Sequence, residues 1–324
     1  MMRQLCWFCL AAPALLAATA IHAAQPYPDK PIRMVVPWAP GGGSDVSGRI
    51  LAAKLSEALG QQVVVDNRPG AAGNIGTAIT SKAAADGHTL LLADTGFSTG
   101  ISLYANPGYH PVRDFAPVSL AATTPIVVAV HPSVQATSVK ELIALAKAQP
   151  GRLNAGSGGT GGSVHLAGEM FQLQTGTKLT HVPYKGSGPA VVDLTAGLVQ
   201  VMFSTAPPVV PLIKAGRIRA LAVASSARSS FLPDVPTTRE AGLPDFVADN
   251  WYGVLVPAGA PRLVIERLHL EIAKAVMQPD ARARFEGAGL ESRSSRSAQE
   301  FGAFVENDVA RWAKVIKQAN IRLE

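Results

Sequence analysis

The stretch VVPWAPGGGSDVSGRILAAKLSEALG, residues Val35–Gly60, joins an apolar run, three successive glycines and an amphipathic segment. Glycines at the turn between a strand and a helix let the backbone come close to a ligand, and the exposed N–H groups at the start of a helix attract anions. Ser44 can cap this helix and Gly60 can end it. The stretch therefore predicts a strand, a glycine-rich loop and a helix, with a loop that binds phosphate, a carboxylate or no ligand.

A carboxylate suits this loop better than a phosphate or a dinucleotide. A phosphate-binding Walker loop needs a Lys-Ser/Thr pair after its last glycine, whereas Ser44-Asp45 follows here. A dinucleotide fingerprint spaces its glycines as G-x-G-x-x-G, whereas these are contiguous. Backbone N–H groups from Gly41 to Ser44 would face a carboxylate, and the helix dipole would add about 0.3–1 kcal/mol. A tight turn that simply needs glycine is the alternative.

Short apolar runs alternate with helical patterns along the rest of the chain. QVVVDN and HTLLLAD predict strands on either side of the helical segment NIGTAITSKAAADG, an order that predicts a parallel sheet with helices on both faces. A second alternating set runs from PIVVAVHP to RIRALAVAS, and one more strand, WYGVLVPAG, precedes a helical tail from Pro261 to Glu324. The sequence thus predicts an α/β fold with two α/β units.

A second glycine-rich loop, GSGGTGGSV, lies between a strand and a helix of the second unit. Ser157, Thr160 and Ser163 offer hydroxyls there, and Ser163 can also cap the following helix. A flexible linker is the alternative interpretation, but the regular elements flank this loop closely. Two such loops on two units predict a cleft that holds a ligand from both sides.

The N-terminal segment MMRQLCWFCLAAPALLAATAIHAAQPYP places Arg3 before an apolar run that ends among small residues, a pattern typical of a secretory signal peptide. Cleavage near Ala23, with Ala20 as the other position, would yield an exported, periplasmic protein. A membrane anchor is the alternative, but Pro13 interrupts the run and the run is short for a span of about 20 residues. Both cysteines of the chain lie in this segment, so disulfides and thiolate sites are not expected after cleavage.

Composition argues against several classes of function. The chain has 324 residues and a formal net charge of +6, its basic residues are scattered, and aromatic residues make up 6%, so neither a nucleic-acid surface nor a base-stacking platform is expected. The histidines lack metal-ligand spacing, which argues against a metal site. We expect no metal, no cofactor and no catalytic residues.

Several motifs resemble one known family. These are, in order, YPDKPIRMVVPWAPGGGSD, VVVDNRPGAAGNIG, ADGHTLLLADTG, DFAPVSL, HVPYKGSGPAVVDL, IKAGRIRALAVAS, LPDVPTTREAGLPDF and WYGVLVPAGAP. Their order and spacing are similar to those of the periplasmic substrate-binding proteins of tripartite tricarboxylate transporters, the Bug-type receptors. The resemblance runs from Tyr27 to the C-terminus.

The resemblance implies a type II periplasmic-binding-protein fold, in which two α/β lobes joined by two crossing strands close over a ligand. The crossings would lie near PIVVAV and NWYGVLV. Residues 1–23 would form the signal peptide, residues 25–124 with 252–324 the first lobe, and residues 125–251 the second. The resemblance also implies a small organic acid as ligand, a monomeric receptor, and a membrane partner with one large and one small subunit, driven by an ion gradient.

The loops and the strand ends supply the candidate ligand-binding residues. They are Trp38, Ala39, Gly41, Gly42, Gly43, Ser44, Thr95, Ser157, Thr160, Gly162, Ser163, Tyr184, Lys185, Ser204 and Thr205.

Several of these candidates have a second interpretation. Trp38 walls the cleft or packs in the core, and Lys185 attracts the anion or is solvated. His165 contacts the ligand or packs as a polar core residue. Asp94 would repel a carboxylate unless it accepts a hydrogen bond from a ligand hydroxyl or ammonium group, or caps a backbone N–H. Many relatives carry Asp-Asn where this chain has Ser204-Thr205, a neutral pair that argues against an amino-acid ligand.

A solute receptor is the leading hypothesis from these observations. Two others stay open at this point. One is a sensory co-receptor that binds the same ligands and docks on a kinase. The other is a periplasmic hydrolase or lyase, which is the weaker of the two because no pair of acids is set on one helix face for acid/base catalysis.

Overall fold

The computed structural model describes residues 27–318 and 321. The signal-peptide prediction lies outside the described residues. The strands are β1 Ile32–Val36, β2 Val63–Asn67, β3 Thr89–Asp94, β4 Phe115–Val130, β5 Asn154–Ser157, β6 Thr180–Pro183, β7 Val201–Thr205, β8 Arg219–Val223, β9 Asp249–Pro257 and β10 Glu291–Ser292. The helices are α1 Gly43–Leu59, η1 Ala71–Gly73, α2 Asn74–Ser81, α3 Thr95–Leu103, α4 Val139–Ala148, α5 Ser163–Thr175, α6 Ser187–Ala196, α7 Ala206–Lys214, α8 Arg262–Met277, α9 Pro279–Gly287 and α10 Ala298–Gln318.

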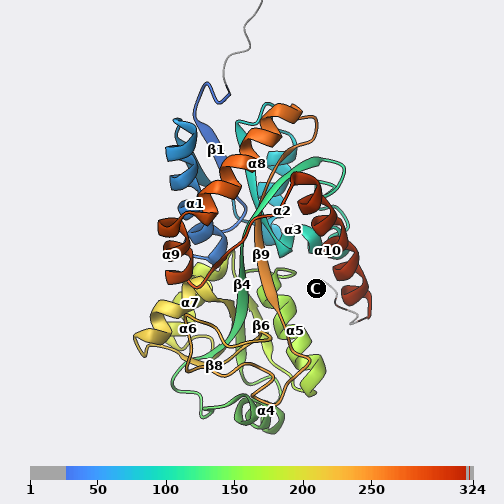
Figure 1. The fold of residues 1–324 in the computed structure, drawn as a ribbon. Helices are drawn as coiled ribbons and strands as arrows, with labels where there is room; N and C mark the ends of the chain where they lie inside the picture. The colour runs from blue at the N-terminus through green and yellow to red at the C-terminus, as the bar shows by residue number, and fades with distance from the viewer. Residues whose placement is uncertain (1–26, 319–320, 322–324) are drawn as a thin grey trace, which may run out of the picture.

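The α/β prediction is confirmed, and Figure 1 shows the chain as two lobes stacked end to end. In the upper lobe β1 pairs in parallel with both β2 and β3, as the β-α-β order predicts. In the lower lobe β5 pairs in parallel with β6 and β7. Each lobe has its own buried core, because strands covered by helices on both faces must be apolar on both faces.

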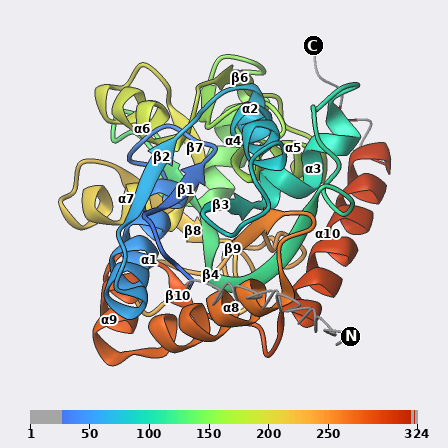
Figure 2. The ribbon, with the colours of Figure 1, turned by 90° about the horizontal axis from the view of Figure 1, so that it is seen from above.

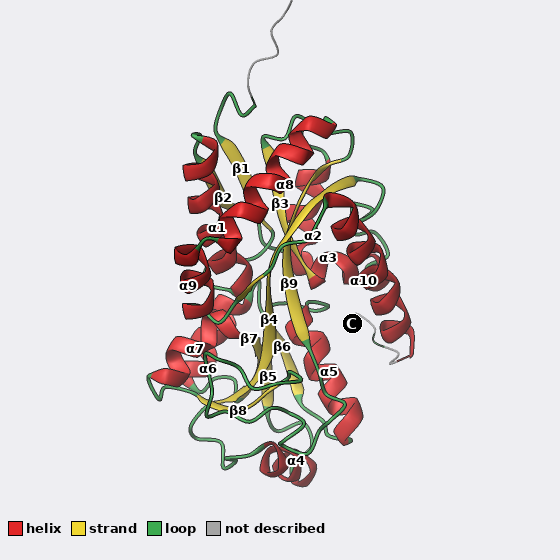
Figure 3. Cartoon of the chain, in the orientation of Figure 1, coloured by secondary structure: helices red, strands yellow, loops and turns green. Residues whose placement is uncertain are grey.

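Two long strands, β4 and β9, run from one lobe into the other (Figure 3). The first half of β4 pairs with β9, and its second half pairs with β7 and β8 in the lower lobe. The segments PIVVAV and NWYGVLV lie in β4 and β9. We propose that the lobe boundaries fall in these two strands, close to residues 124 and 252, so that the strands act as the hinge.

The C-terminal segment covers the upper lobe. Figure 2 shows α8 and α9 near α1, and α10 on the side of α3. On α10 the residues at helical spacing, Phe301, Val305, Trp312 and Ile316, are buried, as a core-facing stripe requires. The end of α10 reaches the lower lobe, where Trp312 and Ile316 pack with Leu166 of α5.

Two helices of the upper lobe differ from the prediction made from the sequence. The helix expected over NIGTAITSKAAADG ends at Ser81. Helix α3, over TGFSTGISL, follows β3 directly and has no counterpart in the expected elements. Its glycines and hydroxyl residues have low helix propensity, but Asp94 caps its start and its first turns are buried. Among the described residues, no helix has the length and apolarity to cross a membrane.

Candidate functional site

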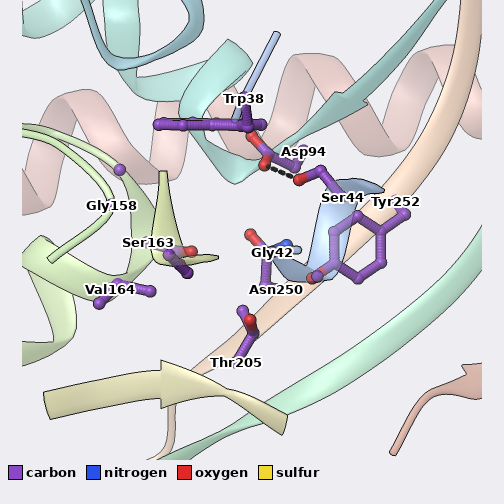
Figure 4. A pocket seen from close by; sticks show the side chains of 13 residues that line it. Trp38, Gly42, Ser44, Asp94, Gly158, Ser163, Val164, Thr205, Asn250 and Tyr252 are labelled. Atoms are coloured by element: carbon purple, nitrogen blue, oxygen red, sulfur yellow. Dashed lines mark hydrogen bonds between the residues drawn. The ribbon is translucent and has the colours of Figure 1, made fainter. Parts of the chain in front are cut away.

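The two glycine-rich loops meet at one pocket between the lobes (Figure 4). The free space that remains in the pocket is small, about 30 Å³, which is enough for one or two water molecules. Its lining comes from both lobes and from the crossing strand β9: Trp38, Gly42, Gly43, Ser44, Asp94, Gly158, Gly162, Ser163, Val164, Ser187, Thr205, Asn250 and Tyr252.

Three helices begin at this pocket. Gly42 precedes α1, Gly162 precedes α5, and Gly186 precedes α6, and no side chain caps any of these three starts. The first N–H groups of a helix have no partner inside the helix, and the dipole makes its start electropositive. The pocket therefore offers backbone donors from three directions to a negatively charged ligand.

The charged side chains of the pocket lining do not attract an anion. No lysine or arginine belongs to the lining among the described residues, and Asp94 is its one charged side chain. Oδ2 of Asp94 accepts a hydrogen bond of 2.8 Å from Ser44 Oγ, and Oδ1 accepts one of 2.9 Å from the N–H of Gly96. Burial raises the pKa of Asp94 to about 6, although these hydrogen bonds favour its charged form.

Two hydroxyl groups of the lining lack a hydrogen bond of standard geometry. These are Tyr252 Oη, on a side chain that is 0% exposed, and Thr205 Oγ1, on one that is 4% exposed. Tyr252 Oη also lies within reach of the Thr205 and Asn250 side chains, so these groups form a polar cluster to which a ligand or water can add a partner. Both hydroxyls lie close to Gly43, where an added Cβ would overlap with Tyr252 Oη.

The lobes are closed over the pocket. The N–H of Ala39 donates to the carbonyl of Lys185 at 3.1 Å, across the cleft. Thr99 Oγ1 donates to the carbonyl of Gly161 at 2.8 Å, and Tyr104 Oη donates to the carbonyl of Thr160 at 2.9 Å. These contacts place upper-lobe residues directly on the lower-lobe glycine loop and on the segment before α6.

Tyr104→Phe removes one of these contacts between the lobes, and we expect it to weaken ligand binding about twofold to tenfold, the usual range for one hydrogen bond. Tyr184→Phe is the matched control, because Tyr184 Oη donates to Asp193 within the lower lobe. Isothermal titration calorimetry measures both. Equal losses of affinity in the two variants would contradict this prediction, because the contact between the lobes would then matter no more than a contact within one lobe.

The structure brings together the candidates Trp38, Gly42, Gly43, Ser44, Gly162, Ser163 and Thr205 in the pocket lining. Their role in ligand binding stays a prediction.

The remaining candidates lie outside this lining. Ala39, Gly41 and Thr160 belong to the loops that meet across the cleft, and Thr95 is buried in α3. The prediction that the Gly41 N–H faces the ligand is wrong, because this N–H donates to Asp45 Oδ2 at 3.0 Å. The Ser204 hydroxyl donates to the carbonyl of Thr205 and so is occupied.

Two of these candidates have side chains that serve other contacts, and the side chain of a third is exposed. The Ser157 hydroxyl turns to His181, and the Tyr184 hydroxyl turns to Asp193. Lys185 is exposed, and it takes part in the contact between the lobes through its backbone carbonyl only. The structure therefore gives no support for an anion contact from the Lys185 side chain.

Some lining residues were not among the candidates: Gly158, Val164, Ser187, Asn250 and Tyr252. Asn250 and Tyr252 lie on the crossing strand β9, and a polar residue inside such an apolar run was the available signal. Ser187 opens α6 after Gly186, the same glycine-then-serine pattern that opens α5.

A histidine pair lies behind the lower glycine loop and holds it in place. Ser157 Oγ is 2.6 Å from His181 Nε2 and accepts a hydrogen bond from the N–H of Gly159. His165 Nδ1 accepts one of 3.1 Å from the N–H of Gly161, and the two rings are 4.1 Å apart. Burial lowers the pKa of His165 to about 3, and electrostatic repulsion from His181 adds to this effect, so His165 is neutral. His165 thus has a packing and positioning role, and it is absent from the pocket lining.

Within residues 27–318 and 321, no group of three or more His, Cys, Asp or Glu side chains is arranged so that it could hold a metal ion.

Comparisons with known proteins agree with this architecture. A family model described as tripartite tricarboxylate transporter family receptor matches residues 48–321. Protein BugT of Bordetella pertussis is 41% identical over 93% of this chain and 93% of its own length. A structure of an R. palustris protein with adipate is 36% identical, with a TM-score of 0.88 over 91% of this chain and 99% of the other. MatC from Rhodopseudomonas palustris with bound malate is 29% identical, with a TM-score of 0.85 over 90% and 100%.

Proposed function

Because this chain belongs to the receptor family of the tripartite tricarboxylate transporters, a family of periplasmic solute-binding proteins, we propose that it binds a small organic carboxylate in the pocket between its lobes. The observation that carries this proposal is the convergence of three helix starts without side-chain caps on one pocket. Such starts suit a carboxylate, since they supply backbone donors and a favourable dipole without a cation. Adipate and malate, the ligands of two structural relatives, are both carboxylates.

The size of the pocket favours a short acid. Only about 30 Å³ is free between the closed lobes, so a short acid would need a small opening of the lobes and a longer acid a larger one. Trp38 forms one wall with its ring, and the Thr205 and Tyr252 hydroxyls are available to polar groups of the ligand.

We further propose that the receptor acts as a monomer in the periplasm and delivers its ligand to a membrane transporter with a large and a small subunit. Residues 1–23 would direct export and then be removed. Family membership and the apolar N-terminal run support this part of the proposal.

We also propose that the protein binds its ligand without converting it. The serine–histidine pair Ser157–His181 would be the place to look for a nucleophile, but Ser157 is 2% exposed and its oxygen is occupied by two protein groups. It supports the loop instead.

A ligand panel tests the proposal. The purified protein is titrated with C4 to C6 dicarboxylates, hydroxy acids, aromatic acids and acidic amino acids, in thermal-shift assays followed by calorimetry. We expect saturable one-site binding of at least one short acid and a rise of several degrees in melting temperature. Uncharged polyols of similar size serve as controls and should have no effect. A polyol that binds while every acid fails would contradict the carboxylate proposal.

A further inference from the structure

We propose that Asp94 is a positioning residue that orients the Ser44 hydroxyl, so that the pocket selects a carboxylate carrying a hydrogen-bond donor, a hydroxyl or ammonium group, on its chain. The proposal rests on the carboxylate-binding function proposed above and adds a rule for choosing among carboxylates. It depends on where the single proton of Ser44 points.

The Ser44 proton is committed to Asp94. The two oxygens are 2.8 Å apart, and an ionised carboxylate can only accept hydrogen bonds, so Ser44 must be the donor. A hydroxyl has one proton and two lone pairs, and Ser44 lines the pocket. Toward a ligand, Ser44 is therefore an acceptor.

Asp94 is held rigidly in this role. Its other carboxylate oxygen, Oδ1, caps α3 by accepting from Gly96, and its side chain is only 6% exposed. Figure 4 shows the Asp94 carboxylate and the Ser44 hydroxyl facing one another beside the Trp38 ring at one end of the pocket. Neither group can reorient without losing a hydrogen bond inside the protein, a loss that is costly for buried groups.

The two ends of the pocket differ in chemistry as a consequence. The starts of α5 and α6 offer N–H donors that match a carboxylate. The Ser44–Asp94 end carries a negative charge and an acceptor oxygen, with no cation in the lining among the described residues. A ligand oxygen without a proton would be repelled there, because Ser44 Oγ and the Asp94 carboxylate both act as acceptors. A hydroxyl or ammonium group of the ligand can instead donate a hydrogen bond to Ser44 Oγ.

Asp94→Asn tests the rule, because it reverses the direction of the hydrogen bond. The amide oxygen can still accept from Gly96, while the amide N–H₂ donates to Ser44 Oγ and frees the Ser44 proton to point into the pocket. The experiment is calorimetry at pH 8 with malate, aspartate and succinate, which share a C4 dicarboxylate frame. In the wild-type protein we expect malate or aspartate to bind about tenfold or more tightly than succinate. In Asp94→Asn that preference should fall to about twofold or reverse.

Two further variants make the result decisive. Ser44→Ala removes the acceptor and should also abolish the preference, and it decides the question if Asp94→Asn does not fold. Asp66→Asn is the control, since Asp66 is a carboxylate of the same lobe that pairs with Arg33 and Arg68 outside the pocket lining, and it should leave the preference unchanged. If the wild-type protein binds succinate as tightly as malate and aspartate, or if both Asp94→Asn and Ser44→Ala retain the preference, the inference is overturned while the carboxylate proposal stands. If no acid of the wider panel binds, the proposed function itself has failed.

Discussion

Replacing Gly188 with alanine is expected to weaken ligand binding about a hundredfold while both lobes remain folded. Gly188 lies in the first turn of α6, and an added Cβ would overlap with the carbonyl oxygen of Pro40 in the other lobe. Gly188 is not among the residues with positive φ, so alanine introduces no backbone strain. The clash exists only when the lobes are closed, so its cost falls on closure and hence on binding.

The control for this variant is Gly287→Ala, at the end of α9, where an added Cβ meets no atom within 4 Å. Calorimetry measures the affinity of each variant, and small-angle scattering measures whether ligand still reduces the radius of gyration. We expect Gly287→Ala to behave as the wild type and Gly188→Ala to stay extended at ligand concentrations that close the wild type. Wild-type affinity in Gly188→Ala would show that the closed state does not bind the ligand.

Replacing Asp94 with asparagine is expected to raise the free energy of unfolding by roughly 3 kcal/mol at pH 8, since a shift of the Asp94 pKa from 3.8 to about 6 corresponds to about 1.4 kcal/mol per pH unit. Burial raises the folded-state pKa, so the folded protein binds this proton more tightly than the unfolded chain does. The penalty of the charged carboxylate is therefore fully present above pH 6, and it disappears as the pH falls toward 4.

Urea unfolding of the wild type and Asp94→Asn at pH 8 and pH 5 checks this sign. The gain of the variant should be about half as large at pH 5 as at pH 8. Tyr109 and Tyr252, the ionisable neighbours that sense the charge of Asp94, have pKa values raised well above this range and do not titrate in it. A variant that is less stable than the wild type at pH 8 would contradict the interpretation. A gain in stability together with altered ligand preference would identify Asp94 as a residue retained for function at a cost in stability.

Most of the strands, loops and helices that form the site could be predicted from the sequence. The side chains that line the pocket could not. The strand, glycine loop and helix of residues 35–60 follow from local rules, because glycine conformation and helix periodicity act over a few residues. Helix α3 was not predicted, because the segment TGFSTGISL has low helix propensity. Burial in the folded protein and the Asp94 cap outweigh that low propensity.

Side-chain direction explains the rest of the difference. Lys185 was a natural candidate for an anion contact, but the fold uses its backbone carbonyl and leaves its side chain exposed. Ser157 ends β5 with its hydroxyl turned to His181, because successive side chains of a strand point to opposite faces. Tyr252 and Asn250 reach the pocket only because β9 crosses between the lobes, an arrangement set by contacts far apart in the sequence.

A crystal structure of the protein with its tightest-binding acid tests the central claim most directly. The account predicts closed lobes, with carboxylate oxygens of the ligand about 2.7–3.1 Å from backbone N–H groups at the helix starts that follow Gly162 and Gly186, and no lysine or arginine side chain in contact. A ligand held instead by arginine side chains would contradict it, for example in the groove beside α8 that Arg262 and Arg296 line.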